Sequence, residues 1–364
     1  MNRGAWVVRL GALLALLGGL NPNLIADNSC NNLGCVSVSK FSASLYAQLQ
    51  GKVVGYVAMV GDRTVEYGWA RTDADPPNRK MSTDVPIYVA SVSKALTAIA
   101  VLQSLGRHNL SIDSKIAPFL PPDWIRGPNI DTITFRQLLT HRAGFRDGSM
   151  SYEGLQQAVK QGVLIADQQK AIYNNLNFAI FRVLLPYMED FSDPGPATRP
   201  EATANFYVNY MRQHVFQPVG VTDADCKPQP HSNPALYYPF PPGDTHGAPV
   251  GDSTLVCGGV GWVLSASDLF RVVESLIHDT KLLTKAQKRQ MDEACLGWDC
   301  SVSRQGDFRG KNGIWYFGNG VSGQTFVGIL KGKLGVVVLT NSQPPGNVSS
   351  VVLKAFQAAS YSFH

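Results

Sequence analysis

Ser91 and Lys94 lie three positions apart in Ser91-Val92-Ser93-Lys94, immediately before the apolar run 95–102. On a helix, residues three apart share one face, one turn apart. A serine hydroxyl is a weak nucleophile until a base removes its proton, and a desolvated amine with a lowered pKa can help to do so. The first turn of a helix also presents free N–H groups that favour developing negative charge. The pattern therefore indicates a nucleophile built for acyl transfer.

The same residue types recur at Ser37-Val38-Ser39-Lys40, so the tetrapeptide needs its context. Short motifs of this kind match many ordinary helix starts. The copy at Ser37 has almost no chain before it to build a scaffold, and it precedes a plain N-terminal helix expected over 41–49. Ser91 instead follows two runs that predict strands, 53–60 and 64–70, and the apolar segment 85–90. Ser91 is therefore the candidate nucleophile.

Tyr173-Asn174-Asn175 is the best second element, between a polar loop and the apolar helix expected over 178–185. A tyrosine hydroxyl beside Lys94 would carry the serine proton to the leaving group. The Asn175 amide would bond both the lysine and a substrate carbonyl. A rival Tyr-x-Asn at 207–209 falls inside an amphipathic helix expected over 206–216, and we interpret it as a packed face.

Together these motifs resemble the serine β-lactamase-related hydrolases, which include class C β-lactamases, D-alanyl-D-alanine carboxypeptidases and family VIII esterases. The resemblance runs from about residue 53 to the last helix. Its further blocks are 133–144, similar to Leu-Leu-Thr-His-x-x-Gly, then 215–222, and 258–262 followed by 265–268. His141 in the first of these is interpreted as structural.

The resemblance implies an α/β (α+β) fold, an antiparallel sheet flanked by helices plus a helical lobe, with the site between them. It also implies acylation of Ser91, a tetrahedral intermediate held by backbone N–H groups, and transfer to water. Lys94 and Tyr173 would share the role of base, as a coupled pair. No cofactor and no metal is required.

The third motif of such enzymes is Lys or His, then one residue, then Gly, on a strand beside the nucleophile. Counting back from Phe326 places Asn319 there, so Asn319, Gly320 and Ser322 join Asn175 as expected substrate-binding residues. An oxyanion hole is expected from the N–H of Ser91 and one near Ser322. Lys311-Asn312-Gly313 matches the motif better but lies too far before the hairpin expected over 324–340, unless a loop intervenes. A neutral Asn at that place would bind a substrate carboxylate poorly and affect a neutral ester or amide less.

The chain has 364 residues, 45% of them hydrophobic, which suffices for a sizeable core. The formal net charge of +5 comes without a basic run or a Lys/Arg-rich helix, which argues against nucleic-acid and membrane-surface partners. A small molecule or a peptide is the expected substrate. We expect a single β-lactamase-related domain over 36–364, with sheet regions at about 36–90 and 255–364 around a helical lobe at about 91–254.

The N-terminus predicts a signal peptide over 1–26. Arg3 and Arg9 precede an apolar stretch, 11–20, that is too short to span a bilayer comfortably, and residues 24–26 suit cleavage. We expect a secreted or periplasmic protein with no stable membrane span after cleavage, while an uncleaved anchor stays open. All six cysteines follow this segment, which fits an oxidising compartment. Six cysteines allow fifteen pairings. In one of them, Cys30/Cys35 and Cys295/Cys300 close short local loops and leave Cys226/Cys257 to close the Pro-rich segment, and no zinc-ligand spacing is present.

Further elements are expected at 334–340 (strand), 351–359 (closing helix), 134–141 and 268–277 (helices). The Pro-rich segment between Cys226 and Cys257 carries Tyr237, Tyr238 and Phe240, which suggest a substrate-gating lid.

The sequence thus predicts an exported serine hydrolase that acts on esters or amides, with D-amino-acid peptides and β-lactams left open. The alternative is a catalytically weak or inactive relative that binds peptidoglycan or peptides, motivated by the missing third-motif cation. A third reading, a nucleophile at Ser253 within Gly251-Asp252-Ser253-Thr254-Leu255, lacks the Asp-x-x-His that such esterases carry downstream.

Overall fold

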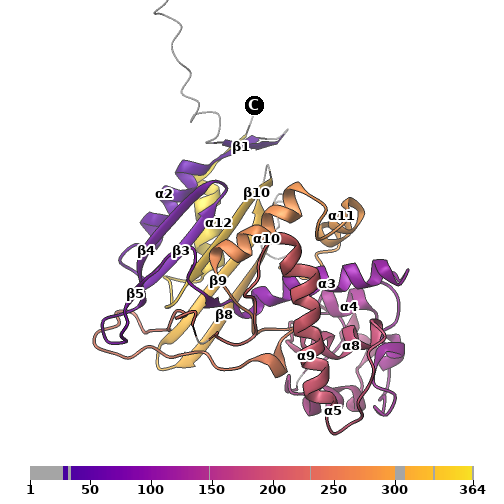
Figure 1. Ribbon diagram of the computed structural model, residues 1–364. Helices are drawn as coiled ribbons and strands as arrows, with labels where there is room; N and C mark the ends of the chain where they lie inside the picture. The colour runs from indigo at the N-terminus through magenta and orange to yellow at the C-terminus, as the bar shows by residue number, and fades with distance from the viewer. Residues whose placement is uncertain are drawn as a thin grey trace, which may run out of the picture.

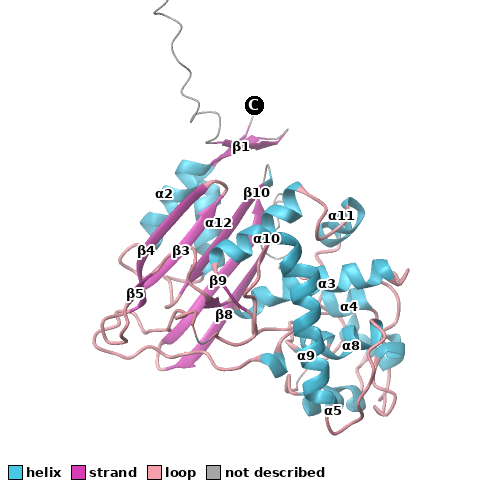
Figure 2. Cartoon of the chain, in the orientation of Figure 1, coloured by secondary structure: helices cyan, strands magenta, loops and turns pink. Residues whose placement is uncertain are grey.

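A six-stranded antiparallel sheet and a group of helices beside it make up the structure, a computed structural model (Figures 1 and 2). It describes residues 28–31, 34–146, 148–229, 231–299, 308–330 and 333–362. The strand order is β5-β4-β3-β10-β9-β8, so β8 is one edge of the sheet. The strands are β3 (Gly55–Val60), β4 (Arg63–Arg71), β5 (Arg79–Lys80), β8 (Arg309–Gly318), β9 (Val321–Leu330) and β10 (Leu334–Thr340).

Both faces of the central strands are buried, because side chains alternate between the faces of a strand. In β3, Tyr56 and Ala58 enter one apolar cluster while Val57 enters the other, and in β10 Val336 and Val337 divide in the same way. Burying a side chain of valine size stabilises a fold by about 1.5–3 kcal/mol. The sheet is therefore the middle layer of three.

Helices α2 (Val38–Leu49) and α12 (Val348–Ala359) cover one face, and α10 (Ala266–His278) crosses the other (Figure 1). The helix α2 begins at Ser37, whose hydroxyl accepts the N–H of Lys40 at 3.3 Å. The first Ser-x-x-Lys is thus a helix cap. That agrees with its interpretation as an ordinary helix start.

The helical part of the chain surrounds α3 (Ser93–Arg107), of which nearly every residue is buried. Around it lie α4 (Phe135–Leu139), α5 (Tyr152–Gln161), α6 (Ile165–Gln168), α7 (Leu176–Ala179), α8 (Phe181–Met188), α9 (Arg199–Met211) and α11 (Lys285–Glu293). On α9 the fully buried Tyr207 has its hydroxyl 2.7 Å from that of Thr97. The rival Tyr-x-Asn is a packed face, as predicted.

Most expected elements are present, and the main omission is β8. The hairpins β3–β4 and β9–β10 and the helices α4 and α10 lie where they were predicted, and α12 begins three residues earlier than expected, at Val348. Short strands β1 (Asn28–Asn31), β2 (Gly34–Ser37) and β11 (Ser360–Ser362) form a small second sheet. The predicted helix over 206–216 is α9 continued by a π-helical turn, Arg212–Phe216.

Two of the three predicted disulfides are confirmed, Cys30–Cys35 and Cys226–Cys257. Cys300 of the third pair and the predicted signal peptide, 1–26, lie outside the described residues. Among the residues that are described, no helix is long and apolar enough to cross a membrane.

The lid prediction is wrong for two of its three aromatic residues. Tyr237 and Tyr238 are buried, and the Tyr237 hydroxyl accepts the N–H of Tyr88 at 2.9 Å. The Tyr238 hydroxyl donates to Asp75 at 2.8 Å. Their rings anchor the Pro-rich segment to the core, so only Phe240, 41% exposed, remains at the surface.

Candidate active site

Ser91 lies in a tight 3₁₀ turn, η1 (Ala90–Val92), that leads directly into α3. The turn follows β6 (Ile87–Tyr88), which pairs with β7 (Val263–Leu264). Ala90 adopts a φ of 48°, a left-handed conformation that is uncommon for a residue with a Cβ. The turn presents Ser91 half-buried between the sheet and the helices, with its N–H in a first helical turn.

Lys94 is fully buried, and its Nζ has three oxygen partners. These are Ser91 Oγ at 2.9 Å, Asn175 Oδ1 at 2.8 Å and the Gly259 carbonyl at 2.6 Å. The last two only accept hydrogen bonds, so a neutral amine can donate its two N–H groups to them and direct its lone pair at the serine hydroxyl. Burial lowers the pKa of Lys94 well below its ordinary value, the Lys311 ammonium lowers it further, and Asp299 opposes the shift. Lys94 is therefore suited to accept the Ser91 proton.

Tyr173 donates its hydroxyl proton to Ser91 Oγ at 2.8 Å, and the residue is 54% exposed. Its ring lies against that of His141, with 4.3 Å between the ring centres. His141 also accepts the Asn174 N–H on Nδ1 at 3.3 Å, and its carbonyl accepts the Ile172 N–H at 2.8 Å. His141 thus fixes the loop that carries Tyr173 and Asn175.

Burial is the main cause that lowers the pKa of His141 to about 3, and the nearby Lys94 and Lys311 side chains lower it further. The ring is therefore neutral at physiological pH, which fits the structural role expected for it.

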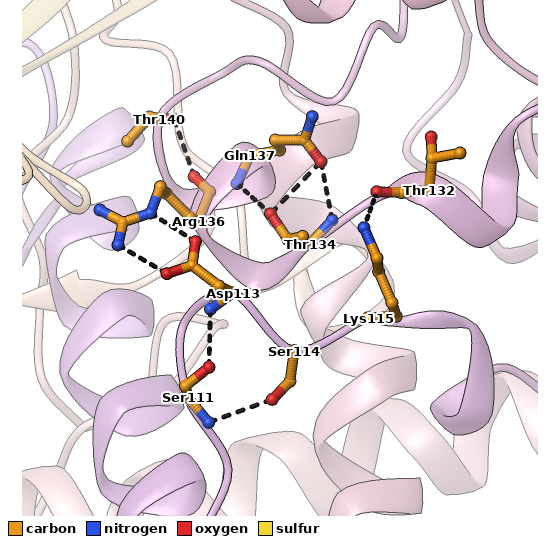
Figure 3. A network of polar contacts seen from close by, with 9 residues as sticks. All are labelled: Ser111, Asp113, Ser114, Lys115, Thr132, Thr134, Arg136, Gln137 and Thr140. Carbon is orange, nitrogen blue, oxygen red and sulfur yellow. Dashed lines mark hydrogen bonds and ion pairs between the residues drawn. The ribbon is translucent and has the colours of Figure 1, made fainter.

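The helix α4, which ends just before His141, is fixed by a network of polar contacts (Figure 3). Thr134 and Gln137 form a capping box at its start. Arg136 makes two bonds to the Asp113 carboxylate, at 2.7 and 2.8 Å, and its carbonyl accepts the Thr140 hydroxyl at 2.7 Å. The network determines where the chain leaves the helix and so where His141 supports Tyr173.

The edge strand β8 passes directly against the Ser91 turn at Gly313. A Cβ added to Gly313 would lie 2.4 Å from the Val89 carbonyl oxygen and 2.9 Å from the Ser91 nitrogen. The neighbouring strand contributes Thr325, whose hydroxyl donates to the same Val89 carbonyl at 2.8 Å. Only glycine allows this close approach of the two backbones.

Lys311, two residues before Gly313, is the cation that sequence analysis did not place at the site. Its Nζ lies 4.9 Å from the centre of the Tyr173 ring and 2.5 Å from Asp299 Oδ1. Lys94 Nζ lies 5.2 Å from the same ring centre. The third motif is therefore Lys311-Asn312-Gly313, and the expected departure from the family pattern is corrected.

Asn319, Gly320 and Ser322 are not brought to Ser91. Asn319 and Gly320 form the turn between β8 and β9, and Ser322 donates its hydroxyl to Gln343 at 3.0 Å. Asn319 lies six positions after Gly313 along the chain, which is about 20 Å at the rise of a β-strand. The Lys311-Asn312-Gly313 motif lies within β8. Counting back from Phe326 had placed the motif at Asn319, which comes after that strand.

A cavity of about 340 Å³ opens beside Tyr173. Its lining comes from the loops on both sides of the site: Thr140, His141, Arg142, Ala171, Tyr173, Glu293, Ala294, Cys295, Trp298 and Asp299. Within the described residues, no group of three or more metal-ligating side chains is found.

The family model described as Beta-lactamase matches residues 42–358 of this chain, a range that contains Ser91, Lys94, Tyr173 and the β8 motif. The chain belongs to the Beta-lactamase family. The resemblance seen in the sequence is thus confirmed, and so is the fold.

Two curated relatives show the range of the family. The putative penicillin-binding protein PbpX of Bacillus subtilis is 26% identical over 216 residues, which are 56% of this chain and 49% of that protein. The lovastatin esterase of Penicillium rubens is 24% identical over 326 residues, 78% of this chain and 79% of that one. The match thus spans about half the length of PbpX.

Solved structures agree in fold. The β-lactamase/D-alanine carboxypeptidase from Pseudomonas syringae has a TM-score of 0.66 at 16% identity, covering 88% of this chain and 97% of that chain. The D-alanine carboxypeptidase AmpC from Burkholderia cenocepacia has a TM-score of 0.65 at 16% identity, covering 88% and 98%.

Proposed function

We propose that this protein is an exported serine hydrolase that cleaves ester or amide bonds through an acyl-enzyme at Ser91. The observation that carries the proposal is the position of Ser91 Oγ, which lies 2.9 Å from Lys94 Nζ and 2.8 Å from the Tyr173 hydroxyl. A serine with a desolvated amine on one side and a tyrosine hydroxyl on the other has both a base and a proton carrier. Purely structural serines do not need either.

Acylation begins as Ser91 Oγ attacks the substrate carbonyl carbon and its proton passes to the Lys94–Tyr173 pair. The carbonyl oxygen becomes an oxyanion in the tetrahedral intermediate. When the intermediate collapses, the bond to the leaving group breaks, and the pair returns the proton to the departing oxygen or nitrogen. Water then attacks the acyl-enzyme in the same way, and the acid is released from Ser91.

Two backbone N–H groups are suited to hold the oxyanion. One belongs to Ser91 itself, in the first turn before α3. The other belongs to Ile314, because the Asn312 N–H bonds Asp299 at 3.1 Å and so points away from β9. In an antiparallel strand, the N–H two residues later points the same way. Ile314 replaces the donor that we expected near Ser322.

The relatives of this chain support the substrate class that we propose. A lovastatin esterase is a relative of this chain, and a D-alanine carboxypeptidase shares its fold, which supports an ester or an amide as the bond that is cleaved. Export is supported by the two disulfides, which persist in oxidising compartments.

The alternative, a non-catalytic binding protein, loses its motivation because Lys311 occupies the place where a cation was thought to be missing. A binder also has no need of the bonds that join Lys94 and Tyr173 to Ser91.

The test is hydrolysis of p-nitrophenyl esters by the wild type and by the Ser91→Ala and Ser253→Ala variants. The proposal expects turnover that Ser91→Ala loses by at least about a thousandfold, since removing the nucleophile leaves only binding contributions. Ser253→Ala should remain as active as the wild type. Loss at Ser253 with activity retained in Ser91→Ala would overturn the assignment.

A further inference from the structure

Asp299 holds Lys311 in a fixed ion pair at the edge of the site. Lys311 is 2% exposed, and its Nζ lies 2.5 Å from Asp299 Oδ1. Asp299 is itself attached to β8 at two further points: its backbone N–H donates to the Gly310 carbonyl at 2.7 Å, and its Oδ2 accepts the Asn312 N–H at 3.1 Å. The carboxylate is therefore built into the strand rather than placed by a mobile surface side chain.

This pairing changes what Lys311 can offer to a substrate. An unpaired ammonium beside Tyr173 would attract a substrate carboxylate. Here the formal charge of Lys311 is already balanced, and a second carboxylate arriving at the ammonium would also meet Asp299. Two like charges brought together in a partly buried site repel strongly.

The cavity beside Tyr173 has the same charge character. Its lining includes the carboxylates of Glu293 and Asp299 and one guanidinium, that of Arg142. Arg142 donates through Nη1 to the Gln169 carbonyl at 2.8 Å, which directs part of its hydrogen-bonding capacity away from a ligand. Since Asp299 is balanced by Lys311 and Glu293 by Arg142, the cavity has no net positive charge to attract a substrate carboxylate.

We infer that Asp299 makes the Ser91 site selective for uncharged acyl substrates, esters and amides that carry no carboxylate next to the scissile bond. The inference rests on the proposed function, because it assigns the substrate class of that same site. Asp299 acts through Lys311 and the charge of the cavity, so it is a specificity-determining residue and takes no part in bond making.

The experiment compares two pairs of esters that differ in one carboxylate. Methyl 4-acetoxybenzoate and 4-acetoxybenzoate differ in the leaving group, and p-nitrophenyl hexanoate and mono-p-nitrophenyl adipate differ at the acyl end. Each kcat/KM is divided by the spontaneous hydrolysis rate of the same ester, which removes differences in chemical reactivity. We expect the wild type to favour the neutral member of at least one pair by about tenfold or more.

Asp299→Asn keeps the size of the side chain and an oxygen acceptor while removing the charge. It should reduce the preference for the neutral ester at least about fivefold, mainly by raising kcat/KM on the anionic one. The matched control is Asp131→Asn, which removes an exposed carboxylate paired with Arg126 and absent from the cavity lining, and it should leave the ratio unchanged. Equal use of the neutral and the anionic ester in both pairs by the wild type, or an unchanged ratio in folded Asp299→Asn, would overturn the inference.

A second measurement needs no variant of Asp299. Phenylboronic acid and 3-carboxyphenylboronic acid both form an adduct with an activated serine, and their inhibition constants for the wild type should differ by about tenfold or more in favour of the neutral compound. Equal constants, or tighter binding of the anionic compound, would contradict the charge argument alone. If none of the four esters were hydrolysed and neither boronic acid bound, in folded protein, the proposed function would instead be rejected.

Discussion

Replacing Lys94 with methionine tests the assignment of the general base. Methionine has nearly the length of lysine and fills the same space, so the variant removes the amine and leaves the packing. Proton transfer by a positioned base contributes about 10²- to 10⁴-fold to rate, and kcat/KM for a neutral ester should fall by that factor. This corresponds to roughly 3–5 kcal/mol of lost transition-state stabilisation.

The fold should survive the change. Losing the amine leaves Asn175 Oδ1 and the Gly259 carbonyl without their lysine donor, at about 1–3 kcal/mol each, while the cost of burying the amine is also removed. A melt followed by circular dichroism should therefore show a cooperative transition for Lys94→Met.

The chain supplies its own control in the first Ser-x-x-Lys. Lys40 is exposed, and only its backbone N–H contributes to the cap at Ser37. Lys40→Met should keep the activity within about twofold of wild type, as expected for a surface change outside the site. If folded Lys94→Met retained more than a third of the wild-type kcat/KM, the reasoning about the base would be refuted.

Three further changes test single parts of the site. Tyr173→Phe keeps the ring against His141 but loses the hydroxyl on Ser91, so kcat for an ester should fall about 10²-fold with little change in thermal stability. Gly313→Ala places a Cβ 2.9 Å from the Ser91 nitrogen, so β8 must shift and kcat/KM should fall at least about tenfold. A wild-type rate would show that the strand does not press on the nucleophile. His141→Asn tests the lowered pKa of His141, which is about 3 in the folded protein. As the pH falls below 6.5, the unfolded state takes up a proton on this histidine and the folded state does not. The stability that His141 contributes above pH 6.5 is therefore lost as the pH falls toward 3. Urea unfolding over this range should show a pH slope that is smaller in His141→Asn by up to about 1.4 kcal/mol per pH unit, and identical slopes would contradict the buried neutral ring.

Ser91, Lys94, Tyr173 and Asn175 could be predicted because each pair is encoded locally. A spacing of three places Ser91 and Lys94 on one side of a helix start, whatever the rest of the fold does. Tyr173 and Asn175 likewise share one short loop, held in the structure by His141. The sheet hairpins were predictable for the same reason, since alternation and turn residues are local signals.

Lys311 was misplaced because its position depends on a strand pairing. The strand β8 is rich in aromatic and glycine residues and lacks a clean alternation, so its hairpin with β9 was not recognised. A usable signal was present: Asn319-Gly320, whose residues favour the tight turn of a two-stranded hairpin. That turn places a further strand before it, with Lys311 and Gly313 near its middle.

Asp299 had no local signal at all. It lies twelve positions before Lys311, and only its tertiary contacts with the outer edge of β8 bring the two side chains together. The substrate preference that we infer therefore depends on tertiary structure, whereas the nucleophile can be read from a tetrapeptide.

The most direct test of the central claim is the intact mass of the protein after exposure to a fluorophosphonate, followed by peptide mapping, with Ser91→Ala alongside and a penicillin in a separate reaction. We predict one phosphonyl adduct on the peptide that contains Ser91, absent from Ser91→Ala, and a penicillin adduct that is slower because that molecule carries a carboxylate. An adduct that persists in Ser91→Ala, or no adduct in folded wild type, would contradict an activated nucleophile at Ser91.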